Sequence, residues 1–193
     1  MNNLHKAYLK SKKGSVWKTQ VQMYEQDYLS KLAQTSDELE SHTYVPKEGA
    51  TFETFERGKR RVIRSNPFKD RVVRRCLCDI ALVPQLKPYL IHDNGASQAG
   101  KGISFTRKRF EQHLHEYYRK YGTNEGYILL MDYSKYYDNI RHDKLKEAVR
   151  KHIHDPEVLW LLDLILKNFE IDVSYLDDER YKRCLEMKFN NEK

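Results

Sequence analysis

The first regular pattern along the chain is a helical spacing of apolar residues. From Val16 to Leu39 they recur at roughly helical spacing and are separated by Lys, Gln and Glu, as in an amphipathic helix. Trp17 stands at the beginning of this pattern. We therefore expect one amphipathic helix over residues 16–39, with Trp17 anchoring its start.

A pattern of two strands follows. Residues 41–56 contain one Pro and one Gly and then alternate Phe with polar residues, which predicts a turn and a short strand. Residues 61–63, Arg-Val-Ile, predict a second strand. Asn66-Pro67 is expected to end it, because the residue before a proline is conformationally restricted.

Asp70 marks the expected start of the next helix. A carboxylate at this point can accept hydrogen bonds from the free N–H groups of a first helical turn. Pro84 is expected to end the helix. Its inward-facing residues are predicted to be Val73, Leu77, Ile80 and Ala81.

Residues 93–102 are expected to form a loop, because they hold three of the eight glycines of the chain. An amphipathic helix is predicted after this loop. One side of it carries Ile103, Phe110, Leu114 and Tyr117. We expect Tyr117 and Tyr118 to take part in packing, although exposed rings of this kind can also stack on bases.

Residues 127–131, Tyr-Ile-Leu-Leu-Met, form a continuous apolar run of strand length. Such a run predicts a strand that is buried on both faces. The run ends at Asp132.

Two helices and a strand are predicted in the last part of the chain. The helices, near 143–152 and over 155–168, each begin with an Asp that can act as N-cap, and the second has Pro156 at its first position. Residues 169–175 alternate as a strand with one buried face does. Together these elements predict an α+β fold, rich in helices and with short antiparallel strands.

Composition is consistent with a folded protein. Of the 193 residues 39% are hydrophobic, and 14 Tyr and 7 Phe supply the large apolar side chains that disordered chains lack. Three Cys without a CxxC pair indicate a reducing compartment. No apolar run approaches the roughly 20 residues of a membrane helix. We therefore expect a cytoplasmic protein that does not enter a membrane.

Positive charge is concentrated in one segment. Lys and Arg outnumber Asp and Glu by 35 to 28, which gives a net charge of +7. Residues 57–75 hold nine Lys and Arg and a single acid, Asp70, so the remainder is close to neutral. A one-sided block of this kind indicates a local site for an anion, with a solvated charged face as the alternative.

Asp132 is a candidate for metal chemistry. A carboxylate at the end of a buried strand is held rigidly and faces a cleft, which suits a divalent cation with oxygen ligands. Two-metal phosphoryl transfer uses such carboxylates. Taken alone, an Asp after a strand also fits a cap or a turn.

Residues 132–139, DYSKYYDN, resemble motif A of the bacterial reverse transcriptases of the prophage, retron and group II intron kind. The resemblance implies the fingers and the first part of the palm of such an enzyme. It implies an RNA-directed DNA polymerase that adds deoxynucleotides to a primer. By this match Asp132 is the catalytic residue and binds Mg²⁺, or alternatively Mn²⁺, together with the carbonyl of Tyr133.

The same motif implies roles for its other residues. Tyr137 would lie under the sugar of the incoming deoxynucleoside triphosphate and reject a 2′-hydroxyl group. Asp138 and Asn139 match the motif and would be structural.

Residues 58–75 resemble the fingers hairpin of the family and the helix after it, although Asn66-Pro67 lies one residue away from the usual Ile-Pro. The resemblance implies contacts to the triphosphate and to the template backbone, for which the planar fork of Arg is well suited. The candidates for these contacts are Lys59, Arg61 and Arg71. Further nucleic-acid contacts are expected from Arg64, Arg74 and Arg75.

Residues 93–102, DNGASQAGKG, followed by a basic helix, resemble the next motif of the family. The glycines allow backbone N–H groups to approach an anion, and Lys101 adds a charge. We expect Gln98 and Lys101 to contact nucleic acid, which by the resemblance is an RNA template with a DNA primer.

Residues 175–178, Tyr-Leu-Asp-Asp, imitate the aromatic-x-Asp-Asp hairpin of the family. We interpret them as an ordinary hairpin turn. The family places a glycine-bearing loop and a long helix before that hairpin, whereas Gly126 is the last glycine of this chain. The chain is therefore expected to be an N-terminal piece, with a helix and fingers over 1–126 and a partial palm over 127–193, and to be inactive alone.

Two other functions are open at this point. A non-catalytic nucleic-acid-binding module would hold the backbone with residues 57–75 and the 101–121 helix, and Asp132 would be inert. A metal-dependent nuclease would share the carboxylate, but it explains neither Tyr137 nor the basic segment. The sequence does not indicate the oligomeric state or the template specificity.

Overall fold

The computed structural model describes residues 1–56, 58–133, 136–137, 140–169 and 179. The fold is α+β and rich in helices, with a two-stranded antiparallel sheet. The chain divides into two compact units: Met1–Leu77 with Asp155–Lys193, and Cys78–His154. The expected division into fingers and palm after residue 126 stays a prediction.

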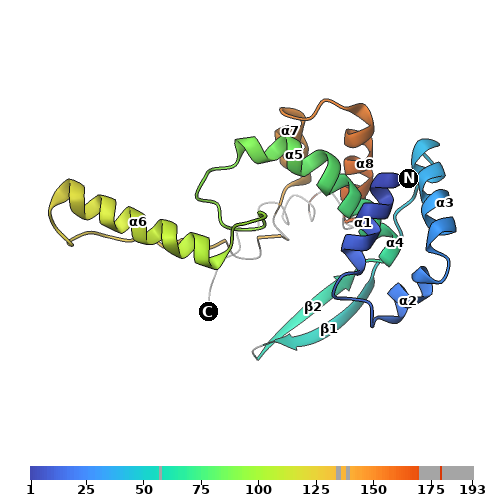
Figure 1. The fold of residues 1–193 in the computed structure, drawn as a ribbon, viewed down its shortest axis with the longest axis horizontal. Coiled ribbons are helices and arrows are strands. Elements are labelled where there is room, and N and C mark those ends of the chain that lie inside the picture. The colour runs from blue at the N-terminus through green and yellow to red at the C-terminus, as the bar shows by residue number, and fades with distance from the viewer. Residues whose placement is uncertain (57, 134–135, 138–139, 170–178, 180–193) are drawn as a thin grey trace. The chain divides into compact units, whose positions relative to one another are not determined.

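The first unit contains most of the helices and the sheet (Figure 1). Its elements are α1 (Asn2–Lys12), α2 (Thr19–Glu25), α3 (Tyr28–Glu40), β1 (Ala50–Glu56), β2 (Lys59–Ser65), α4 (Phe68–Leu77) and α8 (Pro156–Lys167). No pattern in the sequence had indicated α1, although its Leu4, Ala7 and Tyr8 are buried.

An aromatic cluster lies at the centre of this unit. The Tyr8 ring stacks on Tyr28 at 4.8 Å, and Tyr24 meets the ring of Phe68 edge to face at 5.0 Å. Aromatic pairs at these distances add to the free energy gained by burial. The buried core residues are Leu4, Ala7, Tyr8, Val21, Tyr24, Leu32, Tyr44, Phe68, Val72 and Val73.

The helix predicted over residues 16–39 is two helices, α2 and α3, which are separated at Gln26 and Asp27. The prediction of helical structure was right, and the prediction of a single helix was wrong. The segment contains neither Gly nor Pro to indicate the break. Trp17 does not anchor the start, because its side chain is 75% exposed.

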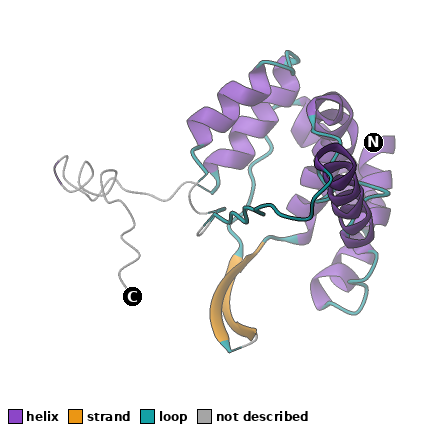
Figure 2. Cartoon of the chain, turned by 90° about the vertical axis from the view of Figure 1, so that its left-hand side faces the viewer, coloured by secondary structure: helices purple, strands orange, loops and turns teal. Residues whose placement is uncertain are grey.

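The predicted pair of strands is confirmed. β1 and β2 form one antiparallel hairpin, in which Ala50 pairs with Ser65 and Glu56 with Lys59 (Figure 2). Gly49 precedes β1 at a close backbone approach, where an added Cβ would lie 2.6 Å from the carbonyl oxygen of Ser65. β2 ends before Asn66-Pro67, as expected.

Asp70 is not the N-cap of α4, which corrects the prediction. The helix begins two residues earlier, at Phe68, so Asp70 lies inside the first turn and is buried. Its Oδ1 accepts a hydrogen bond from the Tyr44 hydroxyl (2.6 Å), and its Oδ2 accepts one from the backbone N–H of Lys47 (3.0 Å). The carboxylate therefore joins the 44–47 segment to α4.

The second unit begins with a series of short helices. These are a π-helical turn η1 (Cys78–Leu82), α5 (Val83–Leu86) and a 3₁₀ turn η2 (Lys87–Tyr89). Val73, Leu77 and Ala81 are buried as predicted, whereas Ile80 is half exposed. Pro84 lies in the first turn of α5 and does not end a helix, because this position needs no N–H donor.

The longest helix is α6 (Ile103–Tyr121), which confirms the helix predicted after the 93–102 loop. Its C-cap, Gly122, is left-handed with φ 68°, a conformation that glycine adopts without strain. The predicted apolar side does not pack, because no residue of α6 is buried.

The prediction of a buried strand over residues 127–131 is wrong. The run has no regular secondary structure, and all five side chains are exposed. A strand needs a hydrogen-bonding neighbour, and within the described ranges β1 and β2 pair only with each other.

The last two predicted helices are present as α7 (His142–Arg150) and α8. Asp155 is the N-cap of α8 and accepts hydrogen bonds from the N–H groups of Glu157 and Val158, as expected. Asp143 is not the N-cap of α7. Arg141 has that position and pairs with the Asp143 carboxylate at 2.6 Å.

The expected strand over 169–175 and the Tyr-Leu-Asp-Asp segment 175–178 lie outside the described residues, apart from Phe169. Among the helices that the structure describes, none has both the length and the apolar character needed to cross a bilayer.

Candidate nucleic-acid interface

The hairpin places the candidate basic residues on two faces. Side chains alternate along a strand, so Arg61 lies on one face of β2, whereas Arg60 and Arg64 share the other. The register therefore separates Arg61 from Arg64, and it places the backbone of Lys59 opposite Glu56. In the sequence the basic positions of residues 57–75 form one block, which does not show that they lie on two faces.

Acidic residues of β1 lie beside the basic residues of β2. Arg60 pairs with Glu53, and Arg61 Nη1 lies 2.9 Å from Glu56 Oε2. All four side chains are exposed, so each pair is weak and can give way to a phosphate. Residues 57–75 are one-sided in charge only because that segment begins after these two glutamates.

Arg71, a candidate contact for the triphosphate, is bound within its own unit. Its Nη2 donates to the Ser11 carbonyl (3.4 Å), and its guanidinium lies 5.5 Å from the centre of the Phe68 ring. The side chain is partly buried, whereas Arg75 is exposed. Arg71 therefore connects α4 to the end of α1.

Arg64 and Arg74 meet on one aromatic ring, although they come from β2 and α4. Their guanidinium carbons lie 5.8 and 4.5 Å from the centre of Phe169. The Nε and Nη2 atoms of Arg74 are buried and have no hydrogen-bond partner. Burial lowers the pKa of Arg74, and the nearby Asp70 carboxylate opposes this shift. The cation is therefore held in place by packing.

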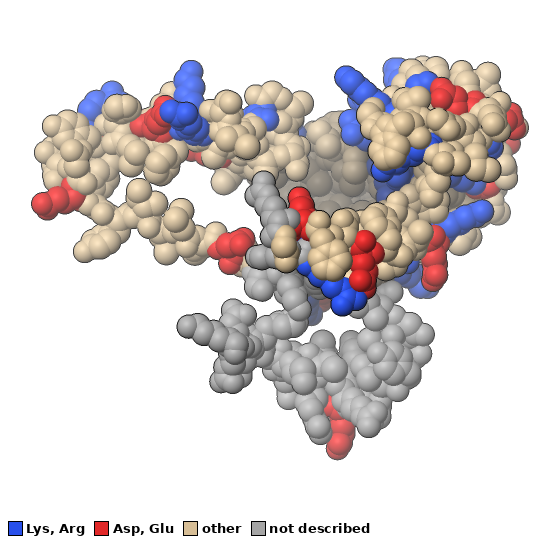
Figure 3. Space-filling view, turned by 90° about the horizontal axis from the view of Figure 1, so that it is seen from below, with Lys and Arg blue, Asp and Glu red and all other residues tan. Residues whose placement is uncertain are grey.

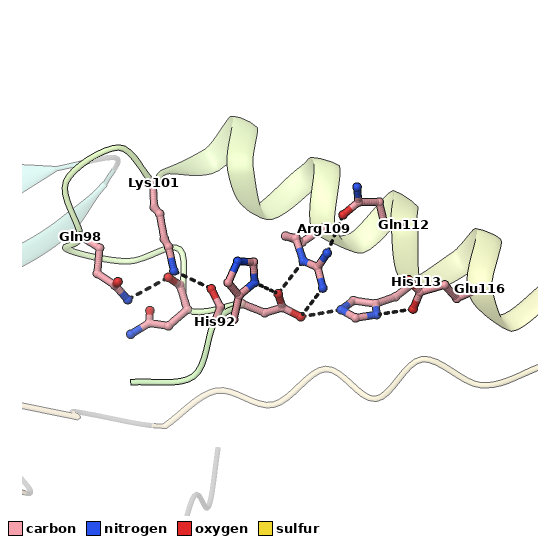
Figure 4. A network of polar contacts seen from close by, with 9 residues as sticks. His92, Gln98, Lys101, Arg109, Gln112, His113 and Glu116 are labelled. Carbon is pink, nitrogen blue, oxygen red and sulfur yellow. Dashed lines mark hydrogen bonds and ion pairs between the residues drawn. The ribbon is translucent and has the colours of Figure 1, made fainter. Parts of the chain in front are cut away.

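The 92–101 loop is attached to α6 through Asp93 (Figure 4). The carboxylate accepts hydrogen bonds from Arg109 Nε (2.5 Å) and Nη2 (3.3 Å) and from His113 Nε2 (2.5 Å), and it pairs with His92 Nδ1 (3.0 Å). Sequence reasoning missed this network. The spacing of four residues between Arg109 and His113 places both on one helix face and could have indicated it.

Gln98 and Lys101, the expected nucleic-acid contacts of this loop, bind its own backbone. Gln98 Nε2 donates to the Asn94 carbonyl (3.0 Å), and Lys101 Nζ donates to the His92 carbonyl (2.6 Å). The Lys101 ammonium also lies 4.9 Å from the centre of the Phe105 ring. Both side chains thus stabilise the loop conformation.

The attachment of this loop is expected to depend on pH. Arg109, and then His92 and His113, hold the pKa of Asp93 well below its usual range. Asp93 raises the pKa of His113 above its ordinary value of 6.5. Asp93 therefore contributes stability above about pH 4 that is lost in stronger acid, and His113 contributes stability below about pH 6.5 that is lost as it deprotonates.

Hydrogen exchange measures this effect. Amides of the loop should exchange faster at pH 8 than at pH 5.5, after correction for the intrinsic pH dependence of exchange. In His113→Gln, which cannot be protonated, this difference should become smaller. An unchanged difference in the variant would show that His113 does not control the loop.

Asp132 and its neighbours form an exposed segment. Asp132, Tyr133 and Tyr137 are all exposed, and the Tyr136 and Tyr137 rings meet edge to face at 5.3 Å. The motif residues Asp138 and Asn139 lie outside the described residues. The expected rigid position of Asp132 at a strand end is therefore not found.

The oxygen donors of this segment can be compared with the ligands that Mg²⁺ requires. Mg²⁺ prefers octahedral oxygen ligands, and two-metal catalysis needs more than one carboxylate. Asp132 and the carbonyl of Tyr133 supply two oxygen donors. The described part of the motif does not complete a magnesium site, and no catalytic step follows from it.

Neither a protein-family model nor a curated protein is significantly similar to this chain.

Proposed function

We propose that this chain supplies the nucleotide- and template-binding fingers of an RNA-directed DNA polymerase of the bacterial reverse transcriptase kind. The observation that carries the proposal is the β1–β2 hairpin followed directly by α4. Arg61 lies on one face of this hairpin, where it pairs with Glu56. The resemblance of residues 58–75 to the fingers hairpin and helix of that family supports the proposal.

The hairpin suits a triphosphate ligand because Arg60 and Arg61 are exposed and only weakly paired. A phosphate oxygen can replace Glu56 at the Arg61 guanidinium without removing a buried contact. Apolar side chains on the same face, Phe52 and Ile63, pair across the strands and are also exposed. They can cover an uncharged part of the ligand while the cations hold its phosphates.

Catalysis by the isolated chain is not part of this proposal. Bound magnesium would stabilise the attacking and leaving oxygens of nucleotide addition, and Asp132 would offer it one carboxylate. The apolar run before Asp132 has no strand neighbour in the described ranges, so that carboxylate is not fixed. We expect no primer extension by the 193-residue chain.

The hairpin provides its own matched control for the binding test. Arg60 and Arg61 are adjacent, exposed and each paired with one glutamate, but they face opposite sides. Arg61→Ala should weaken binding of a fluorescent deoxynucleoside triphosphate in Mg²⁺ about tenfold, since a charge-assisted hydrogen bond is lost. Arg60→Ala should change it much less. Equal losses would mean that charge alone matters and that the hairpin face has no role.

A non-catalytic nucleic-acid-binding module is the second candidate, and the exposed position of Asp132 favours it. Metal titration separates the two functions. If Asp132→Ala leaves the affinity for Mg²⁺ or Mn²⁺ unchanged, the metal-binding role that the resemblance gives Asp132 is wrong. If Asp132→Ala lowers that affinity, the inert role of Asp132 in a binding module is wrong.

A further inference from the structure

The α6 helix exposes a row of aromatic and apolar side chains that the sequence assigned to packing. Tyr118 and Tyr121 are 52% and 56% exposed, and Phe110 and Leu114 are exposed to a similar extent. Tyr127, in the segment after the helix, is fully exposed. Exposed aromatic and apolar side chains gathered on one helix and the segment after it are typical of an interaction site.

Two tyrosine rings at the C-terminal end of α6, Tyr117 and Tyr121, are held by neighbouring groups. The Tyr117 hydroxyl donates to the Glu125 carbonyl (2.7 Å), and the Tyr117 and Tyr121 rings lie 4.7 Å apart. The Lys120 ammonium lies 5.1 Å from the centre of the Tyr121 ring. These contacts restrict the Tyr117 and Tyr121 rings, so a flat partner can stack on Tyr121 at a small entropy cost.

Cations accompany these rings. Arg107 and Arg109 are paired with Glu111 and Asp93, but in the described part of the chain Lys108, Arg119 and Lys120 have no carboxylate partner. Figure 3 shows Lys and Arg side chains along one edge of the helix, with uncharged surface beside them. A hollow of about 480 Å³ lies beside Tyr118 and Arg119, and Gln112, His115, Glu116 and Arg109 complete its lining.

We propose that the C-terminal half of α6, together with Tyr127, binds single-stranded nucleic acid. Bases stack on Tyr118, Tyr121 and Tyr127, and the phosphates between them contact Arg119 and Lys120. Proteins bind single strands by alternating stacking rings with cations, because every base has a π-face and every phosphodiester group has a negative charge. Paired bases in a duplex cannot reach the rings, so single strands are preferred.

Charge opposes a second copy of the chain as the occupant. Three cations lie in the first half of α6 (Arg107, Lys108 and Arg109) and two at its end (Arg119 and Lys120). Two copies of the helix, side by side in either direction, would bring like charges together. A polyanion is attracted by both groups.

The stacking role is tested by replacing the rings with an apolar side chain that is not aromatic, and by a Phe control that keeps the ring. Fluorescence anisotropy with a labelled oligouridine measures binding, and a duplex of the same length measures the preference for single strands. The double variant Tyr118→Leu, Tyr121→Leu should lose about tenfold in affinity per ring, and the variant with Phe at both positions should bind like the parent. Both positions are exposed, so the thermal midpoint should not change.

The phosphate contacts are tested by salt dependence. Arg119→Gln with Lys120→Gln should reduce the slope of log affinity against log salt by about 1.4, since each contact to a single strand contributes about 0.7. Lys6→Gln with Lys13→Gln removes the same charge from exposed positions outside α6 and should leave the slope unchanged.

The inference rests on the nucleic-acid part of the proposed function, and the two fail differently. If the Leu variant binds like the parent, or the Phe variant loses affinity as well, the stacking platform is wrong. Loss of self-association in the Leu variant, measured by sedimentation, would make a second copy the occupant and also overturn it. A normal Arg61→Ala variant with a weakened Leu variant would overturn the hairpin proposal and leave the α6 platform standing.

Discussion

Asp70→Ala is expected to lower the free energy of unfolding by about 3–5 kcal/mol, because it removes one member of a buried polar cluster. The Tyr44 hydroxyl and the Lys47 N–H would lose their acceptor. Arg74, whose Nε and Nη2 already have no hydrogen-bond partner, would lose the nearby carboxylate that favours its charge. Urea unfolding followed by circular dichroism measures the loss, which is a large part of the stability of an ordinary domain.

Asp70→Asn is the matched control. The amide has nearly the same shape and keeps an oxygen that can accept one hydrogen bond, so we expect a smaller loss than for Ala. Both variants keep the exposed hairpin intact. A loss below about 1 kcal/mol in Asp70→Ala, the range of exposed sites, would show that the Asp70 cluster does not hold the 44–47 segment to α4.

Tyr8→Ala is the second variant with a large expected effect, about 3–5 kcal/mol of unfolding free energy, as for other large aromatic residues in cores. The ring is 1% exposed and lies between α1, α2, α3 and α4. Its removal would leave a cavity beside Tyr28 and Phe68, whose ring centres lie 4.8 and 6.2 Å from the centre of the Tyr8 ring. Thermal and urea unfolding of the purified variant measure the loss.

The hydroxyl of Tyr8 can be tested separately. It donates to Glu25 (3.1 Å), which also pairs with Lys12 at 2.6 Å. Tyr8→Phe keeps the ring and removes this hydrogen bond, so we expect a loss of about 1 kcal/mol. Equal losses in the Ala and Phe variants would mean that the polar contact, and not the packing of the ring, stabilises the core.

The elements that the sequence predicted correctly have local causes. Asp155 and Pro156 determine the start of α8, because one accepts free N–H groups and the other needs none. Gly122 ends α6 by adopting a left-handed conformation. Alternation of Phe with polar residues in 41–56 predicted β1, and Arg-Val-Ile at 61–63 predicted β2. Each of these signals lies within a few residues of the element it specifies.

The candidate site was predicted only in part, because grouping and burial are not local. Residues 57–75 predicted the cations but not the acids Glu53 and Glu56 that pair with two of them. Arg64 and Arg74 were both candidates for nucleic acid, yet both contact Phe169, about a hundred residues further along the chain. Gln98 and Lys101 were predicted to contact nucleic acid because of their residue types. In the structure both side chains instead donate hydrogen bonds to backbone carbonyls of their own loop.

The sequence by itself determined where most helices and both strands lie, that the charge is concentrated near the hairpin, and which residue types are available for phosphate binding. Tertiary structure decided that Asp70 is buried, that the 127–131 run has no strand neighbour in the described ranges, and that the tyrosines of α6 face solvent. The physical reason is the same in each case. Secondary structure follows from hydrogen bonds and rotamers of neighbouring residues, whereas burial depends on which distant segment supplies the other side of the contact.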